Sequence, residues 1–214
     1  MDINKIEEKL HEYFLIPVIT IDDKEKARNL GKTLIKSELP VAEITLRTKD
    51  ALDAIKIIST NYPQILIGAG TVLTVQQAID AINAGAKFIV SPCLDLEVID
   101  YCMNNNVPVF PGVATPTEIN TAQKKGLKIV KFFPSETYGG IKAINSISAP
   151  FSDVKFIPTG GISLSNLHEY LGNNKVWACG GTWLAKKEYL NNDEFDMIEN
   201  NIFEALKILK EIRR

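Results

Sequence analysis

The sequence predicts an α/β protein, a single-domain (β/α)8 TIM barrel over residues 1–214 with an extra N-terminal helix. Short apolar runs rich in β-branched residues recur about every 20 to 25 residues, the length of one strand–helix unit with short loops. Segments with helical periodicity lie between these runs. The chain of 214 residues is 45% hydrophobic, which suffices for one large core.

The apolar runs define the expected strands in chain order. They are Leu15–Thr20, Val41–Leu46, Ile65–Gly70, Phe88–Ser91, Pro108–Pro111, Ile129–Phe133, Val154–Pro158 and Val176–Cys179. An open doubly wound sheet is the alternative, but it favours a glycine-rich first turn, and the first unit here ends Ile19-Thr-Ile-Asp22 without one.

Helix-start and helix-stop signals fall between these strands. The segment Met1–Ile16 mixes charges with apolar residues, which predicts an amphipathic helix rather than a signal peptide. Thr74–Gln77 and Thr115–Glu118 have capping-box spacing, and the second has a proline at the first helical position. Gly85 and Gly126 are placed where helices end. A last pattern from Phe195 to Leu209 predicts a longer closing helix.

The composition excludes several classes of function. Lysine and arginine total 24 against 26 acidic residues, without a long basic run, so a nucleic-acid partner is not expected. Three cysteines without Cys-x-x-Cys spacing argue against a disulfide framework and a zinc site. No apolar stretch approaches membrane-spanning length. We therefore expect a cytoplasmic protein without a membrane partner or a bound metal.

The second strand contains polar residues on one face. Ala42, Ile44 and Leu46 form its apolar face, which leaves Glu43, Thr45 and Arg47 to point into the barrel or its opening. A buried carboxylate and a buried guanidinium each cost several kcal/mol unless they are paired. The pattern allows a structural Glu43–Arg47 ion pair. It favours a general acid/base beside a carboxylate-binding cation, because both lie at the catalytic end of a strand.

The sixth strand contains a single charge, Lys131, which shares its face with Ile129 and Phe133. Apolar surroundings disfavour the charged form of a lysine, and a neighbouring Arg47 would disfavour it further. The neutral amine is the form that attacks a ketone carbonyl. A lysine whose charged head extends to solvent is the alternative.

Glycines cluster at three further strand ends, in Gly68–Thr71, Thr159–Gly161 and Gly180–Thr182. Glycine lets the backbone approach a ligand and expose its N–H groups. The last two clusters follow strands seven and eight, the usual phosphate position in TIM barrels.

These motifs resemble those of the 2-keto-3-deoxy-6-phosphogluconate (KDPG) aldolase / 4-hydroxy-2-oxoglutarate (KHG) aldolase family, a bacterial class I group. The similarity covers nearly the whole chain. Its segments are Ala42–Thr48, Gly68–Leu73, Ser91-Pro92, Pro111-Gly112, Val130–Pro134, Pro158–Ser163 and Gly180–Leu184.

The resemblance implies a role for each matching residue. Lys131 would be the Schiff-base lysine and Glu43 the proton shuttle. Arg47 and Thr71 would hold the pyruvyl carboxylate, with Thr159 in the same pocket. The residues that would receive the substrate phosphate are Gly160, Gly161, Gly181 and Thr182. The resemblance also implies a homotrimer, a small-molecule 2-keto acid as substrate, and no cofactor or metal beyond the covalent imine.

The sequence leaves the substrate open among KDPG, its galactonate epimer (KDPGal) and KHG. Thr182 stands where the family usually has serine, so the hydroxyl is kept and a methyl is added. Two rival functions share the glycine clusters. One is a phosphosugar isomerase, which needs no imine. The other is a non-catalytic sugar-phosphate-binding barrel, which could have lost Lys131 or Glu43.

Overall fold

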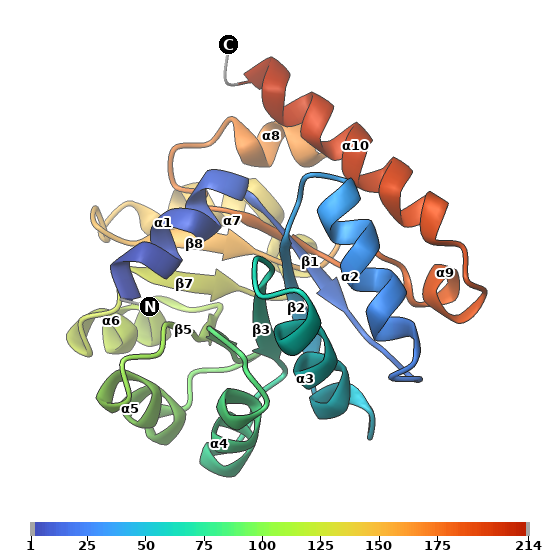
Figure 1. Ribbon diagram of the computed structural model, residues 1–214. Helices are drawn as coiled ribbons and strands as arrows, with labels where there is room; N and C mark the ends of the chain where they lie inside the picture. The colour runs from blue at the N-terminus through green and yellow to red at the C-terminus, as the bar shows by residue number, and fades with distance from the viewer. Residues whose placement is uncertain (1–2, 213–214) are drawn as a thin grey trace.

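The computed structural model describes residues 3–212 and has α/β architecture. Figure 1 shows a curled sheet with helices packed around its outer side. Every two neighbouring strands that pair by hydrogen bonds are parallel. All the strands therefore end at one edge of the curled sheet, and parallel strands of this kind place their functional groups at that edge.

The strands form two hydrogen-bonded groups. Their bounds are β1 (Leu15–Ile19), β2 (Val41–Thr45), β3 (Leu66–Gly70), β4 (Ile89–Val90), β5 (Val109–Phe110), β6 (Gly112–Val113), β7 (Ile129–Phe132), β8 (Lys155–Pro158) and β9 (Cys179–Gly181). One sheet has the order β5-β4-β3-β2-β1-β9, and the other has the order β6-β7-β8.

Two of the predicted strands need correction. The strand predicted at Pro108–Pro111 is only Val109–Phe110 (β5), and a second short strand, β6, follows at Gly112–Val113, where none was predicted; Pro111 separates the two because it has no N–H to donate to a ladder. Its carbonyl instead accepts a hydrogen bond from the N–H of Lys131 at 2.9 Å. The strand predicted at Val176–Cys179 begins only at Cys179, and Val176 makes an isolated bridge to Phe156.

The helices alternate with the strands. Their bounds are α1 (Ile3–Tyr13), α2 (Lys26–Lys36), α3 (Ala51–Asn61), α4 (Val75–Asn83), α5 (Leu96–Asn104), α6 (Pro116–Lys124), the 3-10 helix η1 (Glu136–Tyr138), α7 (Gly140–Ser148), α8 (Leu167–Leu171), α9 (Lys187–Asn191) and α10 (Phe195–Ile212). None of those helices is long and apolar enough to cross a membrane.

The predicted helix ends are mostly confirmed. The Thr115–Glu118 capping box forms in full. At Thr74 only one half forms, because the Gln77 side chain accepts from the N–H of Leu73 rather than from that of Thr74. Gly85 and Gly126 have φ values of +108° and +87°, which glycine adopts readily. The first helix ends at Tyr13, so its predicted continuation to Ile16 is wrong; Met1 and Asp2 lie outside the described residues.

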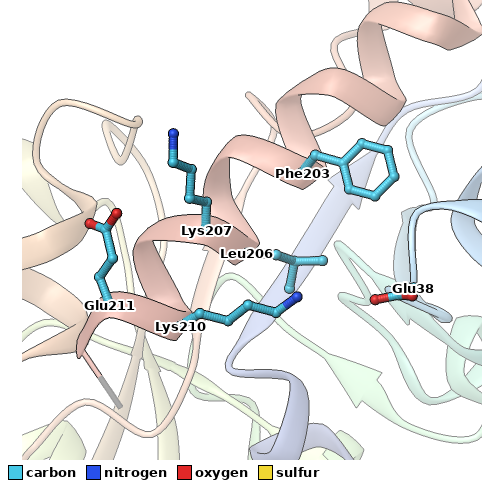
Figure 2. A pocket seen from close by; sticks show the side chains of 6 residues that line it. All are labelled: Glu38, Phe203, Leu206, Lys207, Lys210 and Glu211. Atoms are coloured by element: carbon cyan, nitrogen blue, oxygen red, sulfur yellow. The ribbon is translucent and has the colours of Figure 1, made fainter. Parts of the chain in front are cut away.

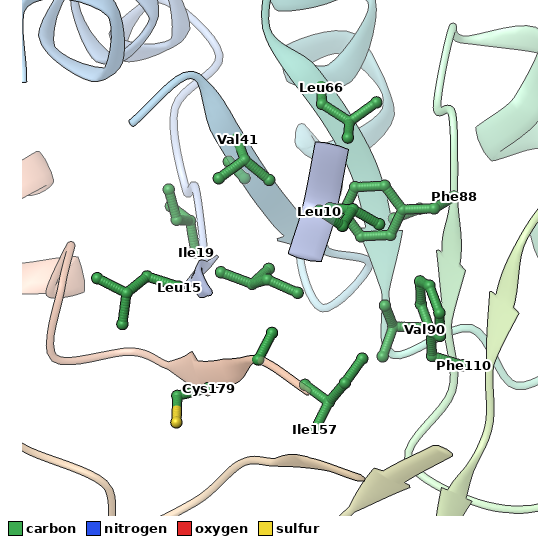
Figure 3. Packing of buried hydrophobic residues seen from close by; sticks show 14 of the residues in the cluster. Leu10, Leu15, Ile19, Val41, Leu66, Phe88, Val90, Phe110, Ile157 and Cys179 are labelled. Atoms are coloured by element: carbon green, nitrogen blue, oxygen red, sulfur yellow. The ribbon is translucent and has the colours of Figure 1, made fainter. Parts of the chain in front are cut away.

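The interior at the N-terminal ends of the strands is apolar. Leu10 of α1 is fully buried and belongs to the same cluster as Phe88 and Phe110 (Figure 3). The Phe88 and Phe110 rings meet edge to face, with centroids 6.1 Å apart. A Cβ at Gly68 would lie 2.3 Å from the Phe88 ring, so glycine is needed there to make room for the aromatic side chain. The first helix therefore closes this end of the sheet with hydrophobic packing.

Candidate active site

Lys131 and Glu43 meet on the inner face of the sheet, from β7 and β2 respectively. Lys131 Nζ lies 3.5 Å from Glu43 Oε1. Both side chains are deeply buried, with exposed fractions of 6% and 4%. The Phe133 ring covers the amine, with its centroid 5.2 Å from Nζ. The predicted inward direction of both residues is therefore confirmed, and each is the other's charged neighbour.

Glycines make room for these side chains. A Cβ at Gly70 would lie 2.0 Å from Glu43 Oε1, and a Cβ at Gly180 would lie 2.4 Å from Thr159 Oγ1. The Gly68–Thr71 cluster was interpreted as a place where the backbone approaches a ligand. That interpretation is wrong for Gly68 and Gly70, because protein side chains already fill the space beside them.

Arg47 lies beyond the end of β2 and is exposed. Its Nε donates a hydrogen bond of 3.1 Å to Thr71 Oγ1. Thr71 has a φ of +59°, a conformation that a β-branched residue rarely adopts. The structural Glu43–Arg47 ion pair that the sequence allowed is absent from the described residues, because Glu43 is paired with Lys131 deeper inside. Thr71 is therefore the side chain that holds Arg47 in place.

A cavity of about 140 Å³ opens at the C-terminal ends of the strands. It is lined by Val18, Arg47, Lys131, Phe133, Thr159, Gly160, Gly161, Ile162, Gly181 and Thr182. All the predicted site residues except Glu43 and Thr71 line it. Glu43 reaches the cavity through its contact with Lys131, and Thr71 through its hydrogen bond to Arg47.

The loop after β8 lines this cavity and contains backbone donors without a protein partner among the described residues. Gly160 and Gly161 have φ values of +98° and +81°. Within residues 3–212, their N–H groups make no hydrogen bond to the protein, although both residues line the cavity. Unpaired backbone N–H groups of this kind form a binding place for an anion.

The sequence interpretation missed the apolar part of the lining. Val18 lies on the same face of β1 as Thr20, and its parity could have indicated that it points inward. Ile162 follows the glycine pair directly, and only the loop conformation decides that it faces the cavity. A hydroxyl pair was also missed: Thr20 Oγ1 and Thr45 Oγ1 lie 2.9 Å apart at the C-terminal ends of β1 and β2.

The arrangement contains the parts of an amine-based reaction. It has a buried amine beside a carboxylate, an arginine for a carboxylate ligand and free N–H groups for a second anion. A larger groove of about 380 Å³ lies elsewhere, between α10 and Glu38 (Figure 2). Its amines and carboxylates, on Lys207, Lys210, Glu38 and Glu211, are all exposed, unlike the buried Lys131 and Glu43. In the described part of the chain, no three His, Cys, Asp or Glu residues are grouped to hold a metal.

Comparisons with known proteins agree with this chemistry. Residues 6–201 match the model of the aldolase family described as KDPG and KHG aldolase. A 2-dehydro-3-deoxy-phosphogluconate aldolase of Haemophilus influenzae is 40% identical over 206 residues, covering 96% of this chain and 97% of that protein. The KHG/KDPG aldolase of Escherichia coli strain K12 is 39% identical, covering 90% of this chain and 91% of that protein.

A solved structure is also similar. It is the KDPG aldolase of Legionella pneumophila, captured with pyruvate as a covalent carbinolamine intermediate. It superposes with a TM-score of 0.87 and 36% sequence identity, covering 91% of this chain and 97% of that one. Its bound pyruvate is covalently attached, as an amine nucleophile requires.

Proposed function

The chain belongs to the KDPG and KHG aldolase family, and we propose that it acts as a class I aldolase through a Schiff base on Lys131. Its reactions are the cleavage of KDPG to pyruvate and glyceraldehyde 3-phosphate, and of KHG to pyruvate and glyoxylate. The observation that carries the proposal is the buried contact between Lys131 Nζ and Glu43 Oε1 at the edge where parallel strands place functional groups.

The reaction begins with a proton transfer within this pair. Passing a proton from Lys131 to Glu43 leaves a neutral amine and a neutral carboxylic acid, which avoids two charges in a buried site. The neutral amine attacks the C2 ketone of the substrate to form a carbinolamine. Glu43 returns its proton to the carbinolamine hydroxyl, which leaves as water, and a protonated imine remains.

The imine allows the carbon–carbon bond to break. It accepts the electron pair of the C3–C4 bond while the Glu43 carboxylate takes the proton of the C4 hydroxyl, so the aldehyde leaves and an enamine remains. Glu43 then returns that proton to C3. Water hydrolyses the resulting imine, which releases pyruvate and restores the amine of Lys131.

Arg47, Thr71 and Thr159 bind the pyruvyl end in this proposal. An arginine holds a carboxylate with two parallel hydrogen bonds, which a lysine cannot do. Thr71 supports this role because its hydroxyl accepts from Arg47 Nε and so orients the guanidinium. Thr159 is buried and lines the same cavity as Lys131. A carboxylate requirement explains selectivity for 2-keto acids over simple ketones.

The phosphate is received by Gly160, Gly161, Gly181 and Thr182. All four line the cavity on the side of β8 and β9. The free N–H groups of Gly160 and Gly161 support this assignment, since a phosphate accepts hydrogen bonds from such groups. The hydroxyl of Thr182 adds a donor, and its methyl group distinguishes it from serine.

We further propose that the whole chain is one closed (β/α)8 barrel with α1 as its extra N-terminal helix. The hydrogen bond from Lys131 to Pro111 and the parallel bridge Thr159↔Gly180 support closure between the two groups of strands. Homotrimer formation stays a proposal based on the family. Leu73 and Leu96 follow the neighbouring strands β3 and β4 and have exposed fractions of 46% and 41%, which suits a surface covered by another subunit.

Trapping with pyruvate and borohydride tests the assignment of Lys131. Reduction should inactivate the enzyme irreversibly and add the mass of a reduced pyruvyl group at Lys131, as peptide mass spectrometry would show. Lys131→Met, which should itself be inactive, should gain no mass under the same conditions. Modification at another lysine would refute the assignment of Lys131. No modification would refute the Schiff base and favour the isomerase or binding-protein alternatives. Chelation with EDTA should leave activity unchanged; strong inhibition would indicate a metal-dependent aldolase.

The substrate is identified by comparing kcat/KM for KDPG, KDPGal and KHG. Free N–H groups at Gly160 and Gly161 favour the phosphorylated substrates. If KHG were cleaved with the highest kcat/KM, the assignment of the phosphate site would be wrong, while the Lys131 assignment would stand.

A further inference from the structure

The segment after β7 donates backbone hydrogen bonds to carbonyl groups of the glycine loop that follows β8. The N–H of Ser135 donates to the carbonyl of Thr159 at 2.8 Å, and the N–H of Glu136 donates to the carbonyl of Gly160 at 3.0 Å. The carbonyls of the loop are therefore turned toward η1. Since the peptide unit is planar, turning a carbonyl one way turns the N–H of the next residue the opposite way. This orientation accounts for the unpaired N–H groups of Gly160 and Gly161.

Three side chains form a hydrogen-bonded series that includes the same segment. Tyr170 of α8 donates its hydroxyl to the Glu136 carboxylate. The Ser135 hydroxyl lies 3.0 Å from the Tyr170 hydroxyl oxygen. A tyrosine hydroxyl has one proton to donate, so Ser135 must be the donor in the second bond. The order of donation is thus from Ser135 to Tyr170 to Glu136.

These hydrogen bonds join the segment that holds the glycine loop to the helix that follows that loop. Ser135 and Glu136 follow the strand that contains Lys131, while Tyr170 lies on the helix that follows the loop. Ser135 and Tyr170 are almost completely buried. Because buried hydroxyl groups are costly to leave without partners, the series fixes the position of α8 relative to η1. The Gly160–Gly161 loop, which lies in the sequence between Lys131 and Tyr170, is bonded to the same segment through Ser135 and Glu136.

Two glycines leave the space that the side chains of Glu136 and Tyr170 occupy. A Cβ at Gly140 would lie 2.6 Å from Glu136 Oε1 and 2.9 Å from the Tyr170 hydroxyl oxygen. A Cβ at Gly161 would lie 2.5 Å from Glu136 Cβ. Glu136 therefore packs directly against Gly161. A displacement of the Glu136 side chain would shift the backbone of the loop.

The Tyr170 hydroxyl stays protonated under working conditions. Burial and the hydrogen bond to Glu136 raise the pKa of Tyr170 above its ordinary value. The proton that bonds to Glu136 is consequently retained over the pH range in which the enzyme would be assayed.

We propose that Tyr170 is a positioning residue for the phosphate end of the substrate: through Ser135 and Glu136, its hydroxyl holds Gly160 and Gly161 in the conformation that presents their N–H groups. The inference rests on the proposed function, because it takes these N–H groups as the phosphate site. Tyr170 does not touch the reacting atoms. Its loss should weaken phosphate binding and leave imine formation at Lys131 intact.

The test compares Tyr170→Phe with Tyr62→Phe. The first variant keeps the ring and removes the hydroxyl. Tyr62 is a matched control, since its hydroxyl donates a single hydrogen bond of 2.9 Å to the carbonyl of Arg28, away from the cavity. For each protein, kcat and KM are measured with KDPG and with KHG. Inhibition of KHG cleavage by inorganic phosphate and trapping of pyruvate by borohydride complete the comparison.

Tyr170→Phe should raise KM for KDPG about five- to tenfold, the factor expected when one hydrogen bond is lost, with kcat nearly unchanged. Inhibition by phosphate should weaken by a similar factor. KM for KHG and the yield of trapped pyruvate should match those of the wild type, as should all values for Tyr62→Phe. Equal losses with KDPG and KHG would overturn the proposal, because they would indicate a general structural role.

A second variant covers the case in which Tyr170→Phe does not fold. Ser135→Ala removes the other end of the series and should raise KM for KDPG in the same direction by a smaller factor, because the bond from Tyr170 to Glu136 remains. Phosphate inhibition of the wild type distinguishes an error in the phosphate site from an error in the positioning role of Tyr170. If phosphate does not compete with substrate there, the phosphate site itself is wrong. If phosphate competes and neither variant changes that competition, only the positioning role is wrong.

Discussion

The two ends of the strands use the same backbone for different purposes. At the N-terminal ends, Leu10, Phe88 and Phe110 fill the interior with apolar side chains (Figure 3). At the C-terminal ends, the interior contains Lys131 and Glu43 in contact. Burial of apolar groups stabilises the fold, whereas a buried ion pair often contributes nothing net. One end therefore supplies stability, and the other retains groups whose value lies in chemistry.

Strand β3 shows this difference within five residues. Gly68 leaves space for the Phe88 ring, and Gly70 leaves space for the Glu43 carboxylate. Both glycines lie on the inner face, two positions apart, so the pleat alone assigns them to the same side. The neighbouring strands decide what each glycine accommodates. The role of a glycine in a strand therefore depends on its position between the N-terminal and C-terminal ends of that strand.

The largest expected effect is at the functional end. Glu43→Gln should lower turnover by about 10²–10⁴, because the amide cannot shuttle a proton. The pyruvate imine at Lys131 should form more slowly, since the amide cannot accept the proton of the amine, but it should still accumulate on long incubation and be trapped by borohydride. Asp53→Asn is the control, since Asp53 is a surface carboxylate paired with Lys24. Steady-state rates and trapping yield would measure both effects. Near-normal turnover in Glu43→Gln would mean that the carboxylate is only structural and that the two ends differ less than we infer.

The glycines of β3 test whether the two ends are separable. Gly68→Ala should destabilise the protein by about 1–3 kcal/mol, as expected when extra volume is forced into a packed core, and should leave kcat unchanged. Gly70→Ala should instead lower kcat, because its Cβ would displace the Glu43 carboxylate. Urea unfolding and kinetics on both variants give the comparison. Equal losses of activity in the two would show that the core and the site are mechanically coupled.

The smallest effect concerns the cysteines. Cys93 is exposed near the C-terminal end of β4, whereas Cys102 and Cys179 are buried. Burial raises the pKa of Cys102 to about 12 and also raises that of Cys179. A raised pKa keeps a thiol protonated and unreactive as long as the pH stays below that value. At about pH 8, a thiol reagent should therefore label Cys93 in the native protein and the other two only after unfolding. Rapid native labelling of Cys102 would indicate that the helix layer opens.

Several features of the fold were predictable from local sequence. Helix ends at Thr115, Gly85 and Gly126 follow from short-range chemistry and are confirmed. Strand limits were less predictable where pairing depends on distant segments. The extra strand β6 after Pro111 and the late start of β9 depend on which neighbouring strand offers a hydrogen bond, and local hydrophobicity does not contain that information.

The predictions for the site divide in the same way. Parity within β2 and β7 was enough to place Glu43 and Lys131 on the inner face, because side chains alternate along a strand. It was not enough to pair Arg47, whose partner is Thr71 and not Glu43. Beyond the end of a strand the alternation stops, and the loop conformation decides the direction of a side chain.

The sequence by itself determined the types of chemical group and the strand faces that present them. These groups are an amine and a carboxylate in apolar strands, and glycine pairs at the ends of the last two strands. Only the tertiary structure decided which groups meet. Lys131 and Glu43 are 88 residues apart, and their contact depends on the curvature of the sheet and the register of every strand between them. The orientation of the Gly160–Gly161 loop likewise depends on Ser135, Glu136 and Tyr170. Local propensities act over a few residues, whereas these contacts arise from packing across the whole sheet.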